Sequence, residues 1–353
     1  MRVFFTAVFL IVSLMAPSGP AQAQTQGSDR IHLRIVGGLA RVNQYTRHEL
    51  PFWSRRLGEL TNGRVTAEIV PFDEAGIRGH EMLRLIQLGV VPFGTALLPL
   101  SASEEPELAA PDLPGLNPDM ATLRRTFGAF RPYVENMLRE RYGIEVLAAY
   151  TYPAQVVFCA KPFAGLGDLR GRRIRTANAS QSHFVEVLGG TPVLTPFAEI
   201  MKNFQNGVVD CALTGTMSGN TIGLHEATTH IHGMAVNWGV SFFGANSSAW
   251  EILPDDIKSL LRKELRGLEQ AIWEESDRET EEGIQCNIGH ASCVSGKKGR
   301  MTRVNVTGLD EAILKKALVD QILPRWVRSC GSDCADNWNR TIGPEVGIFA
   351  ERK

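Results

Sequence analysis

The chain has 353 residues, with 37 basic and 38 acidic side chains and a formal net charge of −1. Near-neutral charge gives no bulk attraction for nucleic acid or for an anionic membrane surface, so we expect neither partner. This length exceeds what one hydrophobic core usually serves, and it predicts two domains.

The amino-terminus has the pattern of an export signal. Arg2 precedes an apolar run over residues 3–15, and Ala21 and Ala23 supply the small residues of a cleavage site. We predict a secretory signal peptide that is cut after Ala23, which places the mature protein in the periplasm. The alternative, a membrane anchor, is disfavoured because about 20 apolar residues are needed to span a bilayer.

Strand and helix patterns alternate along the first part of the mature chain. Alternating apolar residues predict a strand over residues 31–36, and Trp53, Leu57 and Leu60 give helical spacing to residues 45–60. The next stretches are a strand in "NGRVTAEIVPF", a helix in "HEMLRLIQLGV" and a strand in "FGTALLPL". This order predicts a sheet built by crossover connections.

The alternation restarts further along the chain. A helical face runs over residues 123–138, where Pro132 leaves open whether there is one helix or two shorter ones. The elements that follow are strands in "IEVLAAY" and "QVVFCAKP", a strand at 172–176, a helix at about 180–188, a strand in "GGTPV", a helix at about 197–206 and a strand at 208–214. Residues 236–248 read as extended, a long helix starts at Pro254, and the tail is helical around 309–328. Two such units in succession predict two α/β domains.

Six cysteines follow the export signal, and an even number in an oxidising compartment indicates disulfides. Two pairs lie close together in sequence and are predicted to be bonded: Cys286 with Cys293, and Cys330 with Cys334. Cys159 and Cys211 lie on strands that would be neighbours, which would allow a third bond. A metal site built from the four paired cysteines and His290 is the alternative, but these spacings differ from the two-residue knuckles of structural zinc sites. We therefore predict no metal and no cofactor.

Signals for an enzyme are weak. The sequence has no G-x-S-x-G elbow, no H-E-x-x-H, no P-loop and no G-x-G-x-x-G after a strand. His230 and His232 would share one face of a strand and could bind a metal, but a solvated strand edge is the simpler interpretation. Cys211 could act as a nucleophile with a histidine, but no residue is placed to orient the base, and buried structure is the simpler role. We predict that the protein is not an enzyme; an exported enzyme that uses these residues is the alternative.

The stretch "DLRGRRIRTANAS", residues 168–180, contains the arginine that most needs a partner. If residues 172–176 form a strand, Arg173 and Arg175 point to one face, opposite Ile174, at or near the carboxyl end of the sheet. Open α/β sheets bind ligands at that end, and a guanidinium can hold a carboxylate through two parallel hydrogen bonds. A ligand carboxylate and a surface ion pair are the two alternatives for the partner of Arg175.

Five stretches of the chain follow, in one order, the motifs of a known family. "DLRGRRIRTANAS" resembles D-L-K-G-x-K-I-R-V, and "LGGTPVLTPFAEIMKNFQNGVVDCA" resembles a segment that runs from L-G-A-x-P through E-V-Y-x-A-L-Q to G-x-V-D-G. "WEILPDDIKSLL", "LTNGRVTAEIVP" and "EMLRLIQLGV" are similar to W-x-x-L-P-x-D-x-Q-x-x-I, T-N-G-R-I-x-I-x-V-x-P and E-x-L-x-x-V-Q-x-G. Over roughly residues 31–285 the chain thus resembles the DctP-like solute-binding subunits of tripartite ATP-independent periplasmic (TRAP) transporters.

The resemblance implies two α/β domains joined by crossing strands, a long helix that spans both, and a ligand cleft that closes. On this pattern, domain I would comprise residues 24–152 with about 240–280, and domain II residues 153–239 with about 281–353. The resemblance also implies a non-catalytic protein that captures a small carboxylate and passes it to the small and large TRAP membrane permease subunits. A binding protein that serves an ABC permease or a sensor kinase is the alternative, and we expect a monomer.

The resemblance also assigns ligand-binding positions. The arginine that ends the K-I-R motif is Arg175, which would pair with the ligand carboxylate. The aromatic position before the next helix falls on Phe197, and the polar position after the V-D aspartate falls on Thr214. The hinge-strand position that carries a second arginine in sialic-acid binders falls on Gln155, and an acidic pocket position falls near Leu97.

These departures remove polar groups from the expected pocket, and a sugar acid therefore fits it poorly. Trp238, Phe242 and Phe243 would add apolar surface nearby, with ordinary core as the alternative for each. We expect a less polar carboxylate as the ligand, such as a short-chain, keto or aromatic acid.

Overall fold

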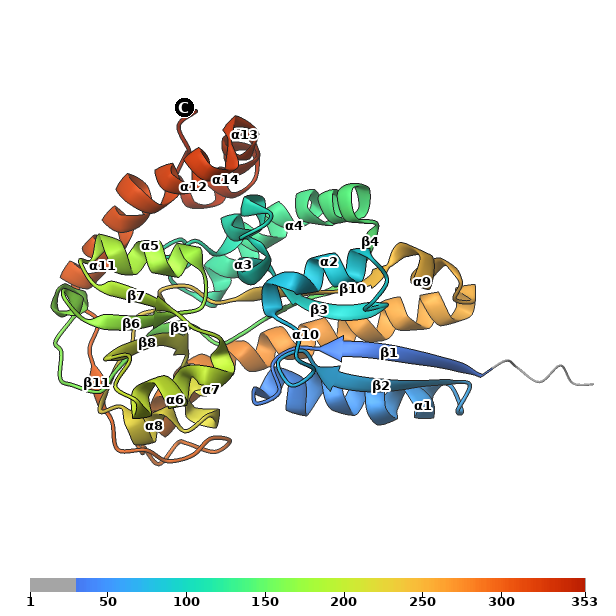
Figure 1. Ribbon diagram of the computed structural model, residues 1–353, viewed down its shortest axis with the longest axis horizontal. Helices are drawn as coiled ribbons and strands as arrows, with labels where there is room; N and C mark the ends of the chain where they lie inside the picture. Colours follow the sequence, from blue (N-terminus) through green and yellow to red (C-terminus); the bar gives the residue numbers. More distant parts are fainter. Residues whose placement is uncertain (1–29, 353) are drawn as a thin grey trace, which may run out of the picture.

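The structure is a computed structural model, and it describes residues 30–352. The predicted signal peptide and its cleavage site lie outside the described residues. Two β-sheets stand side by side, each covered by helices (Figure 1). The strand order is β2-β1-β3-β10-β4 in the first sheet and β11-β9-β5-β8-β6-β7 in the second.

The first sheet has a parallel part and an antiparallel edge. Its strands are β1 (Ile31–Gly37), β2 (Val65–Pro71), β3 (Phe93–Leu97), β4 (Ile144–Thr151) and β10 (Val240–Asn246). β1 pairs in parallel with β2 and β3, whereas β10 runs antiparallel to β3 and β4. The helix predicted over residues 45–60 is present as two π-helical segments and one α-helical turn: η1 (Gln44–Glu49), η2 (Phe52–Arg56) and α1 (Leu57–Leu60).

The second sheet repeats the strand–helix alternation. Its strands are β5 (Gln155–Cys159), β6 (Arg173–Thr176), β7 (Thr191–Leu194), β8 (Cys211–Gly215), β9 (His230–His232) and β11 (Thr302–Val304). β6 pairs in parallel with β7 and β8, and β5 runs antiparallel to β8 and β9. The predicted strand, helix and strand in this region are confirmed as β6, α5 (Ala179–Val187) and β8, with small differences at their ends.

The remaining helices cover the sheets and form the carboxyl-terminal layer. They are η3 (Gly79–Glu81), α2 (Met82–Gln87), α3 (Leu98–Ser101), η4 (Pro106–Asp112), α4 (Met120–Tyr142), η5 (Leu166–Leu169), η6 (Phe197–Glu199), α6 (Ile200–Gln205), α7 (Thr216–Thr221), α8 (Leu224–Ala227), α9 (Ser247–Glu251), α10 (Asp255–Asn287), α11 (Gly308–Ala317), η7 (Leu318–Ile322), α12 (Leu323–Cys330), α13 (Ser332–Arg340) and α14 (Ile342–Val346). Pro132 lies inside a continuous α4, so one helix, rather than two, is correct. The last helix, α14, packs against α4.

Two crossing segments and one helix join the sheets. β4 continues into β5, and the chain returns from β9 to β10, with Gln155 N donating to Asn237 O at 2.7 Å and Tyr152 N to Gly239 O at 3.2 Å. The long helix α10 packs on β4 and on α7, and it thus extends from the first sheet to the part of the chain that holds the second sheet (Figure 1). The fold is therefore a two-domain α/β fold with a spanning helix, as predicted, while the stated domain limits stay a prediction.

Three disulfides tie the second sheet and the carboxyl-terminal part. Cys159 bonds Cys211 across the neighbouring strands β5 and β8. The other two bonds join the close pairs: Cys286 with Cys293, and Cys330 with Cys334. Because the sulfur of Cys211 is bonded, the alternative in which this thiol acts as a nucleophile is wrong.

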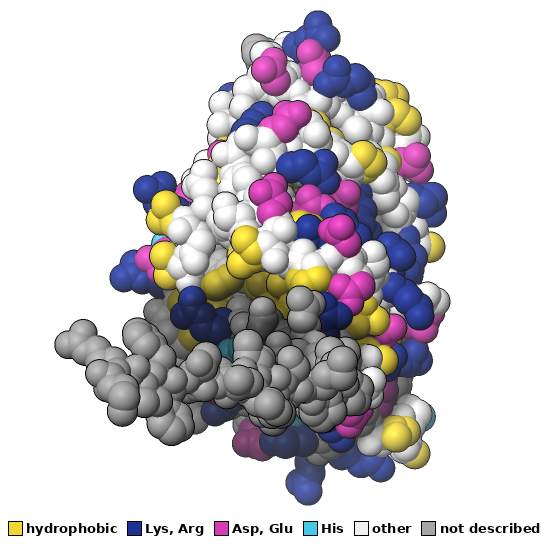
Figure 2. All heavy atoms as spheres, turned by 90° about the vertical axis from the view of Figure 1, so that its right-hand side faces the viewer, with side chains coloured by type: hydrophobic (Ala, Val, Ile, Leu, Met, Phe, Trp, Pro, Cys, Tyr) yellow, Lys and Arg dark blue, Asp and Glu magenta, His cyan; other side chains and the backbone are white. Residues whose placement is uncertain are grey.

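Charges of both signs are mixed on the surface. Figure 2 shows acidic and basic side chains interspersed on the end of the molecule that carries β1 and β2. Many of them pair, as Arg56 does with Glu264 at 3.1 Å. Such a surface fits the near-neutral composition and offers no broad field of one sign. Within residues 30–352, no helix is both long enough and apolar enough to span a membrane.

Candidate ligand-binding site

A cavity of about 720 Å³ lies between the carboxyl-end edges of the two sheets. From the first sheet it is lined by residues that follow β1, β2 and β3, and from the second sheet by residues at and after the ends of β6, β7 and β8. Tyr152 and Gln155, on one crossing segment, complete its floor. This is the place at which open α/β sheets bind ligands, because the turns after parallel strands gather at one edge.

Arg175 lies in the wall of this cavity and is buried, with only 3% of its surface exposed. Its Nε donates to Thr195 O at 3.0 Å and its Nη1 to Leu213 O at 2.8 Å, and no carboxylate pairs with it among residues 30–352. Burial lowers the pKa of Arg175 to about 9, which shows how poorly its charge is compensated. A solvent-facing guanidinium would be expected in an open cleft; here the two backbone carbonyls hold it inside the wall.

Arg173, two residues earlier on β6, shows the opposite arrangement. Its Nη2 donates to Asp210 Oδ1 at 2.8 Å and its Nε to Asp210 Oδ2 at 3.1 Å, on an exposed part of the sheet. This hydrogen bonding lowers the pKa of Asp210. The two arginines thus share a strand but differ in role, because within residues 30–352 only Arg173 has an acidic partner.

On the second-sheet side, three further polar side chains line the cavity, and each has one polar group without a hydrogen-bond partner among residues 30–352. These groups are the Thr214 hydroxyl, the Asn178 amide nitrogen and the Ser218 hydroxyl. Thr214 was expected here from the sequence, and Asn178 and Ser218 were not. Asn178 lies two residues after the end of β6 and caps α5 by accepting from Gln181 N at 3.0 Å, so its place after a strand was a usable signal.

Gln155 and Trp238 lie in a hydrogen-bonded layer beneath the cavity. Gln155 lines the wall, but its Nε2 donates to Trp238 O at 2.6 Å and its Oε1 accepts from Gln181 Nε2 at 2.7 Å. Trp238 does not line the cavity; its indole N–H donates to Asn117 O at 2.9 Å and its backbone N–H to Asp112 Oδ1 at 2.8 Å. Both residues therefore stiffen the crossing segments, and of the two only Gln155 borders the cavity.

The wall contributed by the first sheet is apolar in its interior. Its buried or half-buried apolar side chains are Leu39, Phe72, Ile77, Leu97, Pro99 and Leu100, and Asp73 is the one half-buried acid among its lining residues. Leu97 thus lies in the cavity wall where the sequence placed it, and Phe197 faces the cavity from the second sheet. Phe242 and Phe243 belong to the core and are not part of the lining.

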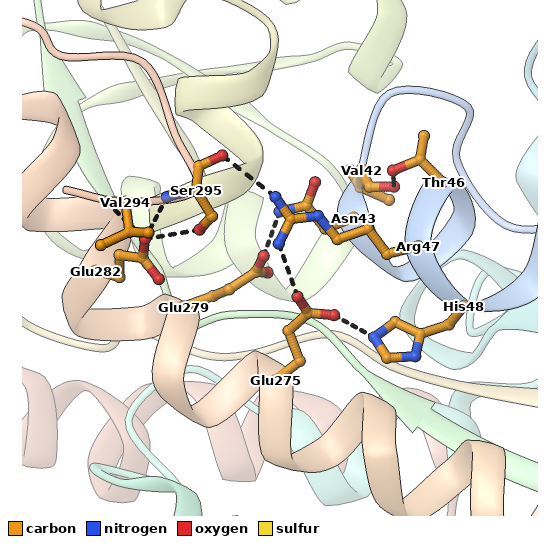
Figure 3. A network of polar contacts seen from close by, with 10 residues as sticks. All are labelled: Val42, Asn43, Thr46, Arg47, His48, Glu275, Glu279, Glu282, Val294 and Ser295. Carbon is orange, nitrogen blue, oxygen red and sulfur yellow. Dashed lines mark hydrogen bonds and ion pairs between the residues drawn. The ribbon is translucent and has the colours of Figure 1, made fainter.

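A polar network on the far side of the crossing segments connects η1 to α10 (Figure 3). Arg47 Nη1 donates to Glu275 Oε1 at 3.0 Å, and His48 pairs with the other oxygen of this carboxylate. Arg47 Nη2 also donates to Ser295 O at 3.3 Å, in the loop that follows α10. Asn43 donates to Glu279, whose pKa burial raises to about 7. The network ties a segment of the first domain to the spanning helix and to the loop beyond it.

The two histidines on β9 lie away from the cavity. His230 and His232 both lie against the ring of Phe163, with ring centroids 6.4 and 6.0 Å away. His232 Nδ1 accepts from Met234 N at 3.2 Å, and its Nε2 lies 3.5 Å from Asp310. Among residues 30–352 there is no cluster of three or more His, Cys, Asp or Glu side chains placed to hold a metal ion. The pair is most simply explained as part of the packing around Phe163.

Two α/β domains joined by crossing segments, with a cavity between them, define the architecture of a periplasmic binding protein. Residues 37–294 match the family model described as bacterial extracellular solute-binding protein, family 7, DctP. The chain belongs to this family, as the sequence motifs predicted.

The chain is also similar to individual proteins. It is 26% identical over 227 residues to the C4-dicarboxylate-binding periplasmic protein DctP of Rhodobacter capsulatus, covering 62% of this chain and 64% of that protein. A match to the uncharacterized protein YiiZ of Salmonella typhimurium is 25% identical and spans 49% of this chain and 54% of that protein. The crystal structure of DctP7, a Bordetella pertussis extracytoplasmic solute receptor that binds pyroglutamic acid, has a TM-score of 0.78 at 21% identity, covering 88% of this chain and 98% of that one.

Proposed function

We propose that this protein captures a small organic acid through its carboxylate and delivers it to the small and large TRAP membrane subunits. It acts in the periplasm, as a monomer without a cofactor, after cleavage of the signal peptide at Ala23. Ligand binding changes the angle between the two domains. Their limits are those predicted from the sequence. The observation that carries this proposal is Arg175, a buried cation beside a cavity without an acidic partner in residues 30–352.

The physical argument is that the charge of Arg175 has no counter-charge near it. A buried charge is costly unless it is paired, and replacing solvent by two carbonyl oxygens leaves the net charge of Arg175 uncompensated. A carboxylate that enters the cavity would supply the counter-charge through charge-assisted hydrogen bonds. Thr214 and Asn178 offer further donors from the same wall. The similar proteins named above bind C4-dicarboxylate and pyroglutamic acid, which both carry carboxylates.

Other functions have less support. An enzyme would have to rely on His230 and His232, which lie outside the cavity. A binding protein for an ABC permease or a sensor kinase would use the same cavity, and neighbouring genes for the two TRAP membrane subunits would decide against it. No feature of the described residues favours either alternative.

The test is calorimetry on Arg175→Ala with the carboxylate that a thermal-shift screen identifies. Removing one member of a buried charge pair costs about 2–5 kcal/mol, which corresponds to a roughly 30- to several-thousand-fold loss of affinity. Arg175→Lys should also bind weakly, because an ammonium cannot reproduce the planar fork. Arg170→Ala is the matched control, since Arg170 is exposed and does not line the cavity. A folded Arg175→Ala protein that binds within about threefold of wild type would end this proposal.

A further inference from the structure

The two walls of the cavity differ in chemistry, and this difference points to a class of ligand. We propose that the ligand is a monocarboxylic acid with an apolar body built around a single aromatic ring. The carboxylate contacts the second-sheet wall at Arg175, and the ring contacts the first-sheet wall. The proposal rests on the carboxylate pairing proposed above and adds what the remainder of the ligand must be.

The interior of the first-sheet wall has no charged side chain. The buried members, Leu39, Phe72 and Pro99, and the half-buried Leu97 and Leu100 are all apolar. Apart from Arg175, the titratable lining residues are Asp73, which is half-buried, and Arg78, His80 and Glu199, which are exposed. The part of the ligand that points away from Arg175 therefore meets hydrocarbon.

A second carboxylate on the ligand would be unfavourable at this wall. It would lose its hydration against apolar side chains and find no buried cation there, which is costly for any ion. Dicarboxylates are thus disfavoured by the loss of hydration at this wall.

Sugar acids are disfavoured for a different reason. Their hydroxyl groups need hydrogen-bond partners along the whole ligand, because each unpaired buried hydroxyl is costly. The free polar groups on Thr214, Asn178 and Ser218 belong to the second-sheet wall with Arg175, and one more, the buried Tyr152 hydroxyl, lies in the floor. Gln155 adds none, since both ends of its amide are bonded within the protein. Polar recognition is therefore concentrated on the second-sheet wall and the floor of the cavity.

Aromatic side chains stand on both sides of the cavity. Phe72 lies in the first-sheet wall, Phe197 in the second-sheet wall, and Tyr152 in the floor between them. Aromatic rings pack against one another in stacked or edge-to-face geometry with a gain beyond the buried area alone. A cavity of about 720 Å³ has ample room for one ring with a short acid side chain. A single ring is thus the apolar body that this lining fits best.

The test is calorimetry on the mature protein with phenylacetate, benzoate, succinate, gluconate and benzyl alcohol. Phenylacetate or benzoate should bind about 100-fold more tightly than succinate or gluconate, and benzyl alcohol, which lacks the carboxylate, should not bind detectably. Binding of the aromatic acid should be lost in Arg175→Ala. Equal binding of succinate and phenylacetate, or a preference for gluconate, would overturn the inference.

A variant of the first-sheet wall sharpens the test. Leu97→Arg places a cation in the apolar wall, so succinate should gain at least about tenfold in affinity and phenylacetate should lose a similar factor. Leu97→Met is the matched control and should keep the wild-type preference. If circular dichroism shows that Leu97→Arg does not fold, the calorimetry of the five compounds on the wild-type protein still tests the proposal.

The two proposals fail in different ways. A preference for succinate or gluconate that depends on Arg175 contradicts the aromatic ligand and leaves carboxylate capture intact. Aromatic binding that persists in Arg175→Ala, or the absence of binding by any carboxylate in a broad thermal-shift screen, contradicts carboxylate capture itself.

Discussion

The two sheets share a fold pattern, but they contribute different things to the cavity. The second sheet supplies the polar groups, and its strands β5 and β8 are joined by a disulfide. The first sheet supplies hydrocarbon, and no cysteine occurs in any of its five strands. Hydrogen bonds to a ligand depend on direction and need fixed donors, whereas apolar contact tolerates small displacements. The comparison teaches that the disulfide between β5 and β8 lies in the sheet that supplies the fixed donors for the proposed ligand carboxylate.

Each domain contains a buried charged group without an ion-pair partner in residues 30–352 whose surroundings can be compared. In the second sheet it is Arg175, which borders the cavity. In the first sheet it is Glu49, which is sealed behind Gly38 and accepts from Thr95 Oγ1. Burial raises the pKa of Glu49 to about 7, so the proton can relieve its charge. A ligand can compensate the first group, while only a proton can compensate the second.

The largest effect on stability should come from the disulfide of the second sheet. The double variant Cys159→Ala, Cys211→Ala opens a loop with a sequence separation of 52, which should lower the free energy of unfolding by about 4 kcal/mol on chain-entropy grounds. The control is Cys330→Ala, Cys334→Ala, whose sequence separation is 4 and whose expected cost is about 2 kcal/mol. Urea unfolding of both proteins measures the difference. An equal loss in the free energy of unfolding for both variants would show that the β5–β8 disulfide does not stabilise the protein more than the other bond.

The next effect concerns Glu49 and pH. Because its pKa is raised from 4.5 to about 7, the folded state holds the proton more tightly than the unfolded chain does. The contribution of Glu49 to the free energy of unfolding is fully present below about pH 4.5 and is lost as the pH rises through about 7. In Glu49→Gln, the decrease in the free energy of unfolding between pH 5 and pH 8 should therefore be smaller by roughly 1–3 kcal/mol.

Part of this loss should persist in Glu49→Gln, because burial also raises the pKa values of Asp112 and Glu279 to about 7. The control is Glu68→Gln, since Glu68 is exposed on β2 and should leave the pH dependence unchanged. Urea unfolding at both pH values provides the measurement. An unchanged pH dependence in Glu49→Gln would show that the first sheet holds no such buried acid.

The smallest effect should come from the ion pair that joins the first domain to the spanning helix. Arg47 keeps 41% of its side chain exposed, so its attraction to Glu275 is screened by solvent. A double-mutant cycle of Arg47→Ala and Glu275→Gln should give a coupling of at most about 1 kcal/mol, which falls further in 0.5 M salt. A coupling several times larger would mean that contacts to the spanning helix rival those within each sheet.

Much of the fold followed from the sequence because it depends on local alternation. The strand–helix order, the long helix after Pro254 and the place of Arg175 at a strand end were all visible in short stretches. What the sequence could not reveal are contacts between distant segments. Trp238 looked like a ligand contact, yet its indole N–H is bonded to Asn117, more than a hundred residues away.

Arg172 shows the same limit on a smaller scale. It stands in an arginine-rich stretch and reads as solvated, but its Nη1 and Nη2 donate to Lys161 O at 3.0 Å and Pro162 O at 2.6 Å. Its guanidinium also lies over the ring of Phe163, 5.7 Å from the centroid. Arg172→Ala would therefore remove contacts within the second domain and not only a solvated charge. Apart from Leu97, the apolar wall escaped prediction in the same way, since its residues come from turns after three separate strands.

The attachment of α10 has a mechanical consequence for what the cavity can admit. Ser276 Oγ donates to Thr151 O at 2.8 Å on β4, and Thr216 Oγ1 of α7 donates to Glu279 O at 3.0 Å. The two anchor points lie less than one helical turn apart, and no proline or glycine that would permit a kink stands between them. The helix thus acts as a stiff strut between the domains, and wide opening would have to break one of these bonds. We therefore expect the cavity to exclude bulky solutes, because they cannot enter simply by forcing the domains further apart.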